Sequence, residues 1–233
     1  MKFIYFLSKE YIWFDQKIKE NLSGLFEVEA IPIESIRKKE GHAHSFAGNS
    51  IKIDLIIDKI KENFGEYIIF SDANIIINKK NKTKLEASIQ EKINQKIDLV
   101  FIHNNDNDIY NNTNIALSLI KCTQETLMFF QKVKENIKKG RLLRWAKGWD
   151  QAEVNYCIRH ESRNLKIEKF DRQKFWVNSN APKHIVDDYY LIKMTGRHYE
   201  CPKQTLRNKI DNLLRSRVIT KEEYDECNIC IER

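Results

Sequence analysis

Acidic and amide side chains directly follow a hydrophobic segment in the first half of the sequence. The tetrapeptide Ser71-Asp72-Ala73-Asn74 comes after the apolar residues 67–70 and before three consecutive isoleucines. A carboxylate that a buried strand delivers to its tip can hold Mg²⁺ or Mn²⁺, and such a cation neutralises the charge on a diphosphate. The alternative is structural, because Asp72 can also close a turn through an Asx hydrogen bond.

Basic residues elsewhere in the chain could contact an anionic ligand. Lys193 and Arg197 can grip a diphosphate through charge-assisted hydrogen bonds, or can simply be solvated. His42 and His44 lie in a polar segment, and a loop does not give such a pair the geometry that metal binding needs. We therefore expect these two histidines to lie at the surface or to contact a nucleotide.

Two tryptophans lie within the basic segment 141–149, a carboxylate directly follows it, and another tryptophan lies further along the chain. Trp145, Trp149 and Trp176 suit stacking on a sugar ring, although we expect at least one of the three to be a core residue. Asp150 can orient an acceptor or act as a base. It can equally cap the helix that we expect to begin there, and both roles are compatible.

The elements that must position these residues alternate between strands and helices. The apolar segments predicted as early strands are 2–7, 24–33, 67–70, 98–102 and 113–120. The segments with helical periodicity are 10–21, 50–63, 82–94, 124–138 and 150–160. This alternation predicts an α/β fold with a mixed, mostly parallel central sheet flanked by helices. Ligands in such folds bind beyond the carboxyl ends of the strands, which is where the acidic tips fall.

The remaining segments are expected to be loops, short strands and a helical tail. Residues 34–49 and 103–112 are polar and long enough to be functional loops. Short strands are predicted near 165–170 and 174–177, and the charged tail 202–226 is expected to be mostly helical. We predict one catalytic domain over residues 1–200, with a helical extension over 201–233 that packs on the same domain.

Composition excludes several classes of protein. The chain has 233 residues with 42% hydrophobic and 11% aromatic side chains, which is not the composition of a disordered chain, and its seven glycines and three prolines argue against a collagen-like fibrous protein. Its apolar runs are too short to cross a bilayer. The formal net charge is +7, but the lysines are scattered among acidic residues, so we expect a solvated surface and no nucleic-acid partner.

The five cysteines indicate a reducing environment. They are odd in number and mostly isolated, unlike the disulfide framework of a small secreted domain. Cys227 and Cys230 form one C-x-x-C pair, which is half of a tetrahedral zinc site, and we interpret it as a coincidence. The protein is therefore expected to be cytoplasmic.

The order of these motifs resembles the core of type-A-fold (GT-A) nucleotide-diphospho-sugar glycosyltransferases. That family has a basic residue early in a helix, here Lys52, and then an Asp-x-Asp motif, here the tip at Asp72. Residues 111–120 resemble the strand that closes around the sugar, and Trp149-Asp150-Gln151-Ala152-Glu153-Val154-Asn155 is similar to the family's W-D-Q helix start. Met194-Thr195-Gly196-Arg197-His198 falls where the family often places a late histidine. The resemblance spans roughly residues 2–199.

The resemblance implies a donor site with one departure from the family pattern. Lys52 would contact the nucleotide, Lys193 or Arg197 the diphosphate, and Gln151 the sugar. Asp72, Asn74 and His198 would hold Mn²⁺ or Mg²⁺, but Asn74 replaces the family's second aspartate. An amide oxygen supplies no charge, so the site could bind metal weakly, work without metal, or be degenerate. A literal Asp-x-Asp occurs at Asp106-Asn107-Asp108, one element late for the family pattern, and ranks second.

The activity that the resemblance implies is sugar transfer from a UDP- or GDP-linked donor to a hydroxyl of a glycan or glycoconjugate. An inverting reaction would need a carboxylate base, for which Asp150 is the first candidate, followed by Glu153 and Asp108. The sequence does not decide between inversion and retention. The alternatives are a catalytically weakened nucleotide- or sugar-binding relative and, less favoured, a basic nucleic-acid-binding protein.

Overall fold

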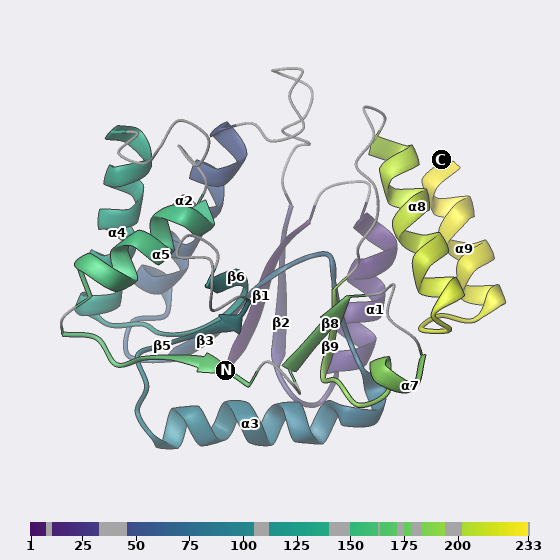
Figure 1. Ribbon diagram of the computed structural model, residues 1–233, viewed down its shortest axis with the longest axis horizontal. Coiled ribbons are helices and arrows are strands. Elements are labelled where there is room, and N and C mark those ends of the chain that lie inside the picture. Colours follow the sequence, from purple (N-terminus) through teal and green to yellow (C-terminus); the bar gives the residue numbers. More distant parts are fainter. Residues whose placement is uncertain are drawn as a thin grey trace. The chain divides into compact units, whose positions relative to one another are not determined.

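A computed structural model describes residues 1–7, 11–32, 46–104, 112–139, 150–162, 164–171, 175–178, 183–193 and 202–232 (Figure 1). The chain forms two compact units, and each is assembled from several separate segments. The first unit contains residues 1–4, 36–71 and 88–172, and the second contains 5–35, 72–87 and 173–233. The strands β1 (Lys2–Leu7) and β3 (Tyr67–Asp72) contribute residues to both units.

The larger sheet has the strand order β2-β1-β3-β6-β5-β7 in the described part of the chain. Its other strands are β2 (Glu27–Pro32), β5 (Leu99–His103), β6 (Thr113–Lys121) and β7 (Ile167–Phe170). Strand β6 runs antiparallel to β3 and β5, whereas β7 runs parallel to β5. Strands β3, β5 and β7 therefore share one direction, and their carboxyl ends lie at one edge. The predicted mixed, mostly parallel sheet flanked by helices is confirmed.

Three helices of the first unit pack on one another. They are α2 (Phe46–Glu62), α4 (Gln124–Lys139) and α5 (Asp150–His160), and α5 also contacts β6. The predicted cap of α4 is present, because Thr123 Oγ1 accepts the Thr126 N–H and Thr126 Oγ1 accepts the Thr123 N–H. Gly65, beyond the end of α2, has a φ of +93°, which a glycine adopts without strain.

The second unit is built around α1 (Ile12–Leu22) and two helices near the end of the chain. Its core joins Trp13 and Phe14 of α1 to apolar residues of α8 (Pro202–Arg215) and α9 (Lys221–Glu232). A small sheet in this unit has the order β4-β9-β8, with β4 (Ile75–Ile77), β9 (Leu191–Lys193) and β8 (Trp176–Asn178). The short 3-10 helix η3 (Lys79–Asn81) follows β4, and α3 (Lys82–Asn94) follows η3. Helix α7 (Lys183–Val186) precedes β9.

Several element predictions need correction. The predicted loop 34–49 is wrong at its end, because the backbone is already helical from Phe46 although Gly48 lowers helix propensity there. Strand β9 was not predicted, because its three residues are too few for a periodic pattern. The helical tail is two helices, which a turn with positive φ at Arg217 separates. The short helices η3 and α7 were not predicted either, and the elements that were predicted lie within a few residues of their expected bounds.

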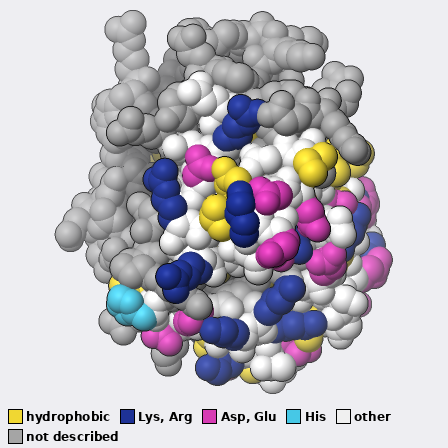
Figure 2. Space-filling model, turned by 90° about the vertical axis from the view of Figure 1, so that its right-hand side faces the viewer, with side chains coloured by type: hydrophobic (Ala, Val, Ile, Leu, Met, Phe, Trp, Pro, Cys, Tyr) yellow, Lys and Arg dark blue, Asp and Glu magenta, His cyan; other side chains and the backbone are white. Residues whose placement is uncertain are grey.

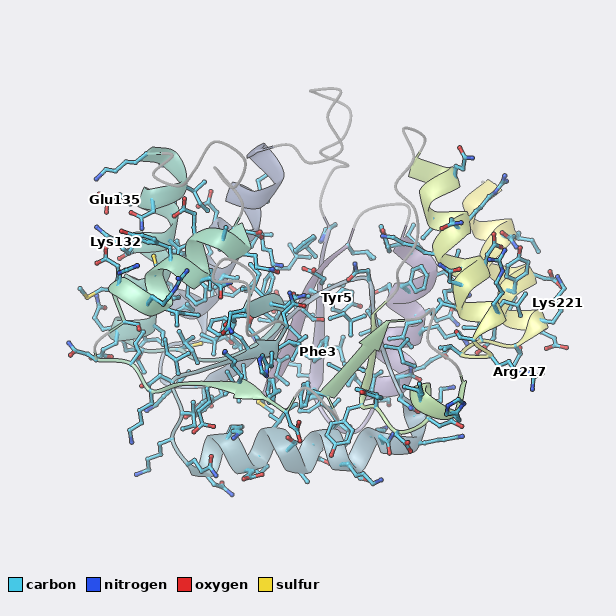
Figure 3. All side chains as sticks on the ribbon, in the orientation of Figure 1. Phe3, Tyr5, Lys132, Glu135, Arg217 and Lys221 are labelled. Carbon is cyan, nitrogen blue, oxygen red and sulfur yellow. The ribbon has the colours of Figure 1, made fainter. Side chains whose placement is uncertain are left out.

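Surface charges are mixed in sign where the structure shows them. The face drawn in Figure 2 has Lys and Arg side chains interspersed with Asp and Glu. On α4, Lys132 pairs with Glu135 at 3.3 Å, and Figure 3 shows both side chains at the surface. The same view labels Phe3 and Tyr5 of β1, which are both buried. Among the described helices, none combines the length and the apolar character that crossing a bilayer requires.

Candidate active site

The carboxyl ends of β3 and β5 form the edge at which the site residues gather. In the sheet, Ser71 of β3 lies opposite Leu117 of β6, and His103 at the end of β5 lies opposite Thr113 at the start of β6. The Asn104 N–H donates to the Asn112 carbonyl oxygen at 2.9 Å. This bond joins the residues on either side of segment 105–111, which contains Asp106-Asn107-Asp108 and lies outside the described residues.

Asn155 docks helix α5 against the first residue of β6. Its Oδ1 accepts the Thr113 N–H at 2.9 Å, and its Nδ2 donates to the Thr113 carbonyl at 2.8 Å. Nδ2 also donates to the Gln151 carbonyl at 2.8 Å, so the side chain joins the first turn of the helix to the strand. Asn155 is 3% exposed, which makes these bonds costly to lose. The start of α5 is thereby fixed at the carboxyl edge of the sheet.

Lys52 and Asp150 approach one another across the first unit. The Lys52 Nζ lies 3.9 Å from Asp150 Oδ2, and their side chains are 8% and 16% exposed. Asp150 is the first residue of α5, and its Oδ1 accepts the N–H of Gln151 at 2.8 Å. One oxygen of Asp150 therefore binds the backbone of the next residue, which is not the bond of an N-cap, and its second oxygen faces an ammonium. Lys52, Asp150 and Gln151 are the sequence-predicted residues that the structure brings together.

Glu153 lies deeper than the other predicted carboxylate of α5. It is in the first turn of the helix, and it is fully buried. Cys157, one turn further along, has its pKa raised to about 12 by burial, and the neighbouring negative charge of Glu153 adds to this rise. A thiol with such a pKa stays protonated at neutral pH and is no nucleophile. Asp150 is better placed than Glu153 to reach a ligand.

A second cluster of predicted residues lies in the other unit, around the turn between β3 and β4. Asp72 is the last residue of β3, and β4 begins at Ile75, directly after Asn74. Strand β9 runs antiparallel to β4, with Ile75 opposite Lys193. The chain therefore leaves β9 for residues 194–198 beside the point where it enters β4 from Asn74. This pairing connects two motifs that are far apart in the sequence.

The oxygen atoms at this turn suit a hard cation. The Asn74 Oδ1 is buried and has no hydrogen-bond partner among the described residues, and the Asp72 carboxylate is two residues away. Oxygen ligands of this kind fit Mg²⁺ or Mn²⁺. No group of three or more His, Cys, Asp or Glu side chains that could hold a metal occurs among the described residues, and His198 and Arg197 lie outside them. Only the backbone of Lys193 is described.

Other predicted residues also fall outside the described part of the chain. They are His42, His44, Trp145 and Trp149, and Trp176 is described only by its backbone. Sequence reasoning missed the role of Asn155, although it is the last residue of the W-D-Q motif. It also missed Asn78 and Asn81, which bind backbone groups of 187–190 and for which the sequence offers no local signal.

Comparisons with known proteins agree with this architecture. The structure is similar to a solved chain titled "Crystal structure of a glycosyltransferase involved in the glycosylation of the major capsid of PBCV-1", with a TM-score of 0.66 and 15% sequence identity. The match covers 94% of this chain and 98% of the solved one. At that identity the likeness shows the fold, and it confirms the predicted GT-A type. No curated protein matches the chain. Residues 61–212, well over half of the chain, match the family described as nucleotide-diphospho-sugar transferase. The chain therefore belongs to the nucleotide-diphospho-sugar transferase family.

Proposed function

We propose that the protein transfers a sugar from a UDP- or GDP-linked donor to a hydroxyl of a glycan or glycoconjugate. Family membership supports glycosyl transfer in general. The observation that carries the more specific proposal is the β4–β9 ladder, which sets Ile75 opposite Lys193. Lys193 directly precedes segment 194–198, and Ile75 directly follows Asn74, so the ladder supports a donor site that takes residues from both motifs.

On the donor side, the proposed roles follow the character of each residue. Lys52 contacts the nucleotide, and Lys193 or Arg197 binds the diphosphate through charge-assisted hydrogen bonds. Asp72 contacts the ribose or a divalent cation, for which Asn74 and His198 are further ligands. A bound Mg²⁺ or Mn²⁺ would neutralise charge on the departing nucleoside diphosphate.

On the acceptor side, the start of α5 supplies the reactive groups. Gln151 binds the sugar, and Asp150 orients the acceptor hydroxyl and, in an inverting reaction, accepts its proton. Glu153 and Asp108 are the second and third candidates for this base. Much of the rate enhancement would come from holding donor and acceptor in line, which removes entropy from the reaction step.

The second candidate function is a nucleotide- or sugar-binding relative with little turnover. The specific observation that favours it is Asn74, an uncharged group at the position of the family's second aspartate. A nucleic-acid-binding role receives less support, because acidic side chains break up the basic ones on the face in Figure 2.

Two further expectations complete the proposal. Residues 1–200 form the catalytic domain, and 201–233 are a helical extension packed on it, which the shared core of α1, α8 and α9 supports. The expected cytoplasmic location stays a prediction from the cysteine pattern.

A donor screen tests the proposed function. UDP- and GDP-sugars are incubated with the protein, with and without Mn²⁺, and both hydrolysis and binding are measured. We expect turnover of at least one donor, increased by Mn²⁺ and abolished by Asp72→Ala in a variant that keeps its circular dichroism spectrum. Binding without turnover would favour the weakened relative, and neither binding nor turnover would reject the donor site.

The late histidine has its own test within that screen. If His198 is a metal ligand, its replacement by alanine should raise the Mn²⁺ concentration needed for activity more than it raises the donor KM. An equal loss of activity at every Mn²⁺ concentration would instead assign His198 to the fold or to the diphosphate.

A further inference from the structure

The pairing of β4 with β9 is poorly specified by its own side chains. Strand β4 consists of three isoleucines, and β9 offers Leu191 and Ile192 opposite two of them. Register in a sheet is normally set by which side chains must face the core. Here a shift by two residues would again place an isoleucine opposite an aliphatic partner for part of the ladder. A three-residue ladder of nearly identical side chains needs another determinant of its register.

Two buried asparagines beyond the end of β4 provide such a determinant. Asn78 donates from its backbone N–H to the Tyr190 carbonyl at 2.9 Å and from Nδ2 to the Tyr189 carbonyl at 3.0 Å. Asn81 donates from Nδ2 to the carbonyls of Asp187 at 2.9 Å and Tyr189 at 3.0 Å. All of these acceptors lie in the four residues that directly precede β9.

Burial and further contacts fix both asparagine side chains in place. Asn78 and Asn81 are 9% and 4% exposed, so water cannot readily replace their partners. Asn78 Oδ1 also accepts the Lys80 N–H at 3.1 Å, which fixes the side chain at the start of η3. At the surface, Lys80 pairs with Asp187 at 3.0 Å. Any slip of β9 along β4 would break these bonds together.

The register matters because the segment directly after β9 carries predicted ligands of the donor site. Each residue of slip moves a strand by about 3.3 Å, and ligands of a metal or a diphosphate must be placed within a few tenths of an ångström. We infer that Asn78 and Asn81 are positioning residues, which set the register of β9 against β4 and so place Lys193, the last residue of β9 and a proposed diphosphate ligand, opposite Ile75, which directly follows Asn74. The inference rests on the proposed donor site, and it assigns a function to two asparagines outside that site.

Disulfide trapping tests the register without any ligand. Cysteines replace Ile76 and Ile192, which lie opposite one another, and in a second double variant they replace Ile76 and Tyr190, which meet only after a two-residue slip. After mild oxidation, peptide mapping measures each disulfide. With Asn81 unchanged, we expect a disulfide in the variant with cysteines at 76 and 192 and none between 76 and 190 in the other variant. When Asn81→Leu is added, the yield of the 76–192 disulfide should fall by at least half. Asn81→Ser serves as the milder variant if Asn81→Leu fails to fold. An unchanged yield in the folded variant would overturn the inference.

Calorimetry with UDP and with GDP, each with Mn²⁺, tests the consequence. We expect at least tenfold weaker nucleotide binding in Asn81→Leu. Binding should recover when Asn81→Leu is combined with cysteines at 76 and 192 and these cysteines are oxidised to a disulfide. The matched control is Asn136→Leu, which removes an equally buried asparagine of α4 whose Nδ2 contacts Cys157 Sγ, and it should change binding less than twofold.

The outcomes separate this inference from the proposed function. A shifted register with unchanged nucleotide binding would overturn the positioning role and leave the donor site intact. If Asn81→Leu and Asn136→Leu weaken nucleotide binding equally and the disulfide does not restore it, Asn81 would act only through the stability of the fold, as Asn136 does. A parent protein that binds neither nucleotide would reject the donor site and the positioning role with it, while the trapping result would still decide what sets the register.

Discussion

The Lys52 ammonium lies 3.9 Å from the Asp150 carboxylate, and this approach joins helix α2 to the first residue of α5. Both side chains are mostly buried, so their charges interact more strongly than they would in water. Residues that the sequence separates by almost a hundred positions thus meet at one edge of the sheet. A ligand that binds there meets a cation and a carboxylate together.

Replacing Asp150 by asparagine separates its two roles. The amide of Asp150→Asn would still accept the Gln151 N–H, because an asparagine Oδ1 is also a hydrogen-bond acceptor, but it could not accept a proton. We expect kcat to fall by roughly 10²–10⁴-fold with a stability loss of about 1 kcal/mol, measured by steady-state kinetics and urea unfolding. The matched control is Asp54→Asn, which breaks the 2.5 Å ion pair of Asp54 with Lys134 and should leave kcat unchanged. Near-normal kcat in Asp150→Asn would shift the search for the base to Glu153 and Asp108.

Removing the Asn155 amide should loosen the start of α5. Asn155→Leu deletes three hydrogen bonds, and the two buried ones are those with the backbone N–H and carbonyl of Thr113. We expect the free energy of unfolding to drop by about 2–4 kcal/mol, measured by urea titration. Asn155→Asp keeps the acceptor for the Thr113 N–H but sets a carboxylate against the carbonyls of Thr113 and Gln151. We therefore expect Asn155→Asp to be no more stable than Asn155→Leu. A loss below about 0.5 kcal/mol in Asn155→Leu would contradict this docking role.

Replacing Asn74 by aspartate tests the departure from the family pattern. The added charge should raise the apparent affinity for Mn²⁺ by roughly tenfold, about 1–2 kcal/mol, if the turn binds metal. Turnover need not rise, because tighter binding of the ground state does not lower the chemical barrier. If the protein works without metal, the new anion should instead weaken donor binding.

Calorimetry of UDP and GDP, with and without Mn²⁺, on the parent and on Asn74→Asp distinguishes these results. Identical binding in both proteins under all conditions would place Asn74 outside the site, and Asp106-Asn107-Asp108 should then be tested in its place.

The contact between α1 and α9 should depend on pH. Lys17 Nζ lies 2.8 Å from Glu223 Oε1, with side chains 17% and 25% exposed. Burial opposes both charges, but the hydrogen bond and the opposite charge outweigh it, so the pKa of Lys17 is raised and the pKa of Glu223 is lowered. The lowered pKa of Glu223 stabilises the fold above the carboxyl's unfolded value, and this contribution disappears as pH falls through the folded value. The raised pKa of Lys17 stabilises the fold until pH rises through it.

The variant Glu223→Gln measures this contribution. At pH 7 it should lower the free energy of unfolding by about 0.5–1 kcal/mol. The difference from the parent protein should vanish when urea titrations are repeated below the folded pKa of Glu223. Asp225→Asn, which breaks the exposed pair with Lys221, is the control and should have little effect at either pH. A difference that stays constant with pH would mean that Glu223 acts through packing and not through its charge.

Patterns of local sequence predicted much of the sheet and its helices. Strands such as β3 and β6 are long apolar runs, and α4 has both a helical period and a capping threonine, so each could be recognised without knowledge of its neighbours. Strand β9 could not, because three residues carry no period and its partner β4 lies more than a hundred residues away.

The site was predictable to a similar extent. Asp72, Asp150 and Lys52 could be proposed as site residues because each lies at the end of an element or in a motif with a family likeness, and their roles stay predictions. Asn78, Asn81 and Asn155 could not, because an asparagine that binds a distant backbone carbonyl looks in the sequence like any other loop or helix asparagine. Such bonds are properties of the tertiary fold, and a single sequence does not display them.

The shared core of α1 and the last two helices has a consequence for biosynthesis. Trp13 and Phe14 leave the ribosome well before their partners Leu206, Ile210 and Cys227 are made, because about 190 residues or more separate them along the chain. At roughly 5–20 residues per second, the nascent chain holds these two aromatic rings uncovered for on the order of 10–40 s. During that interval the apolar face of α1 can bind other nascent chains, so the yield in cells should depend on chaperones that shield Trp13 and Phe14 during translation.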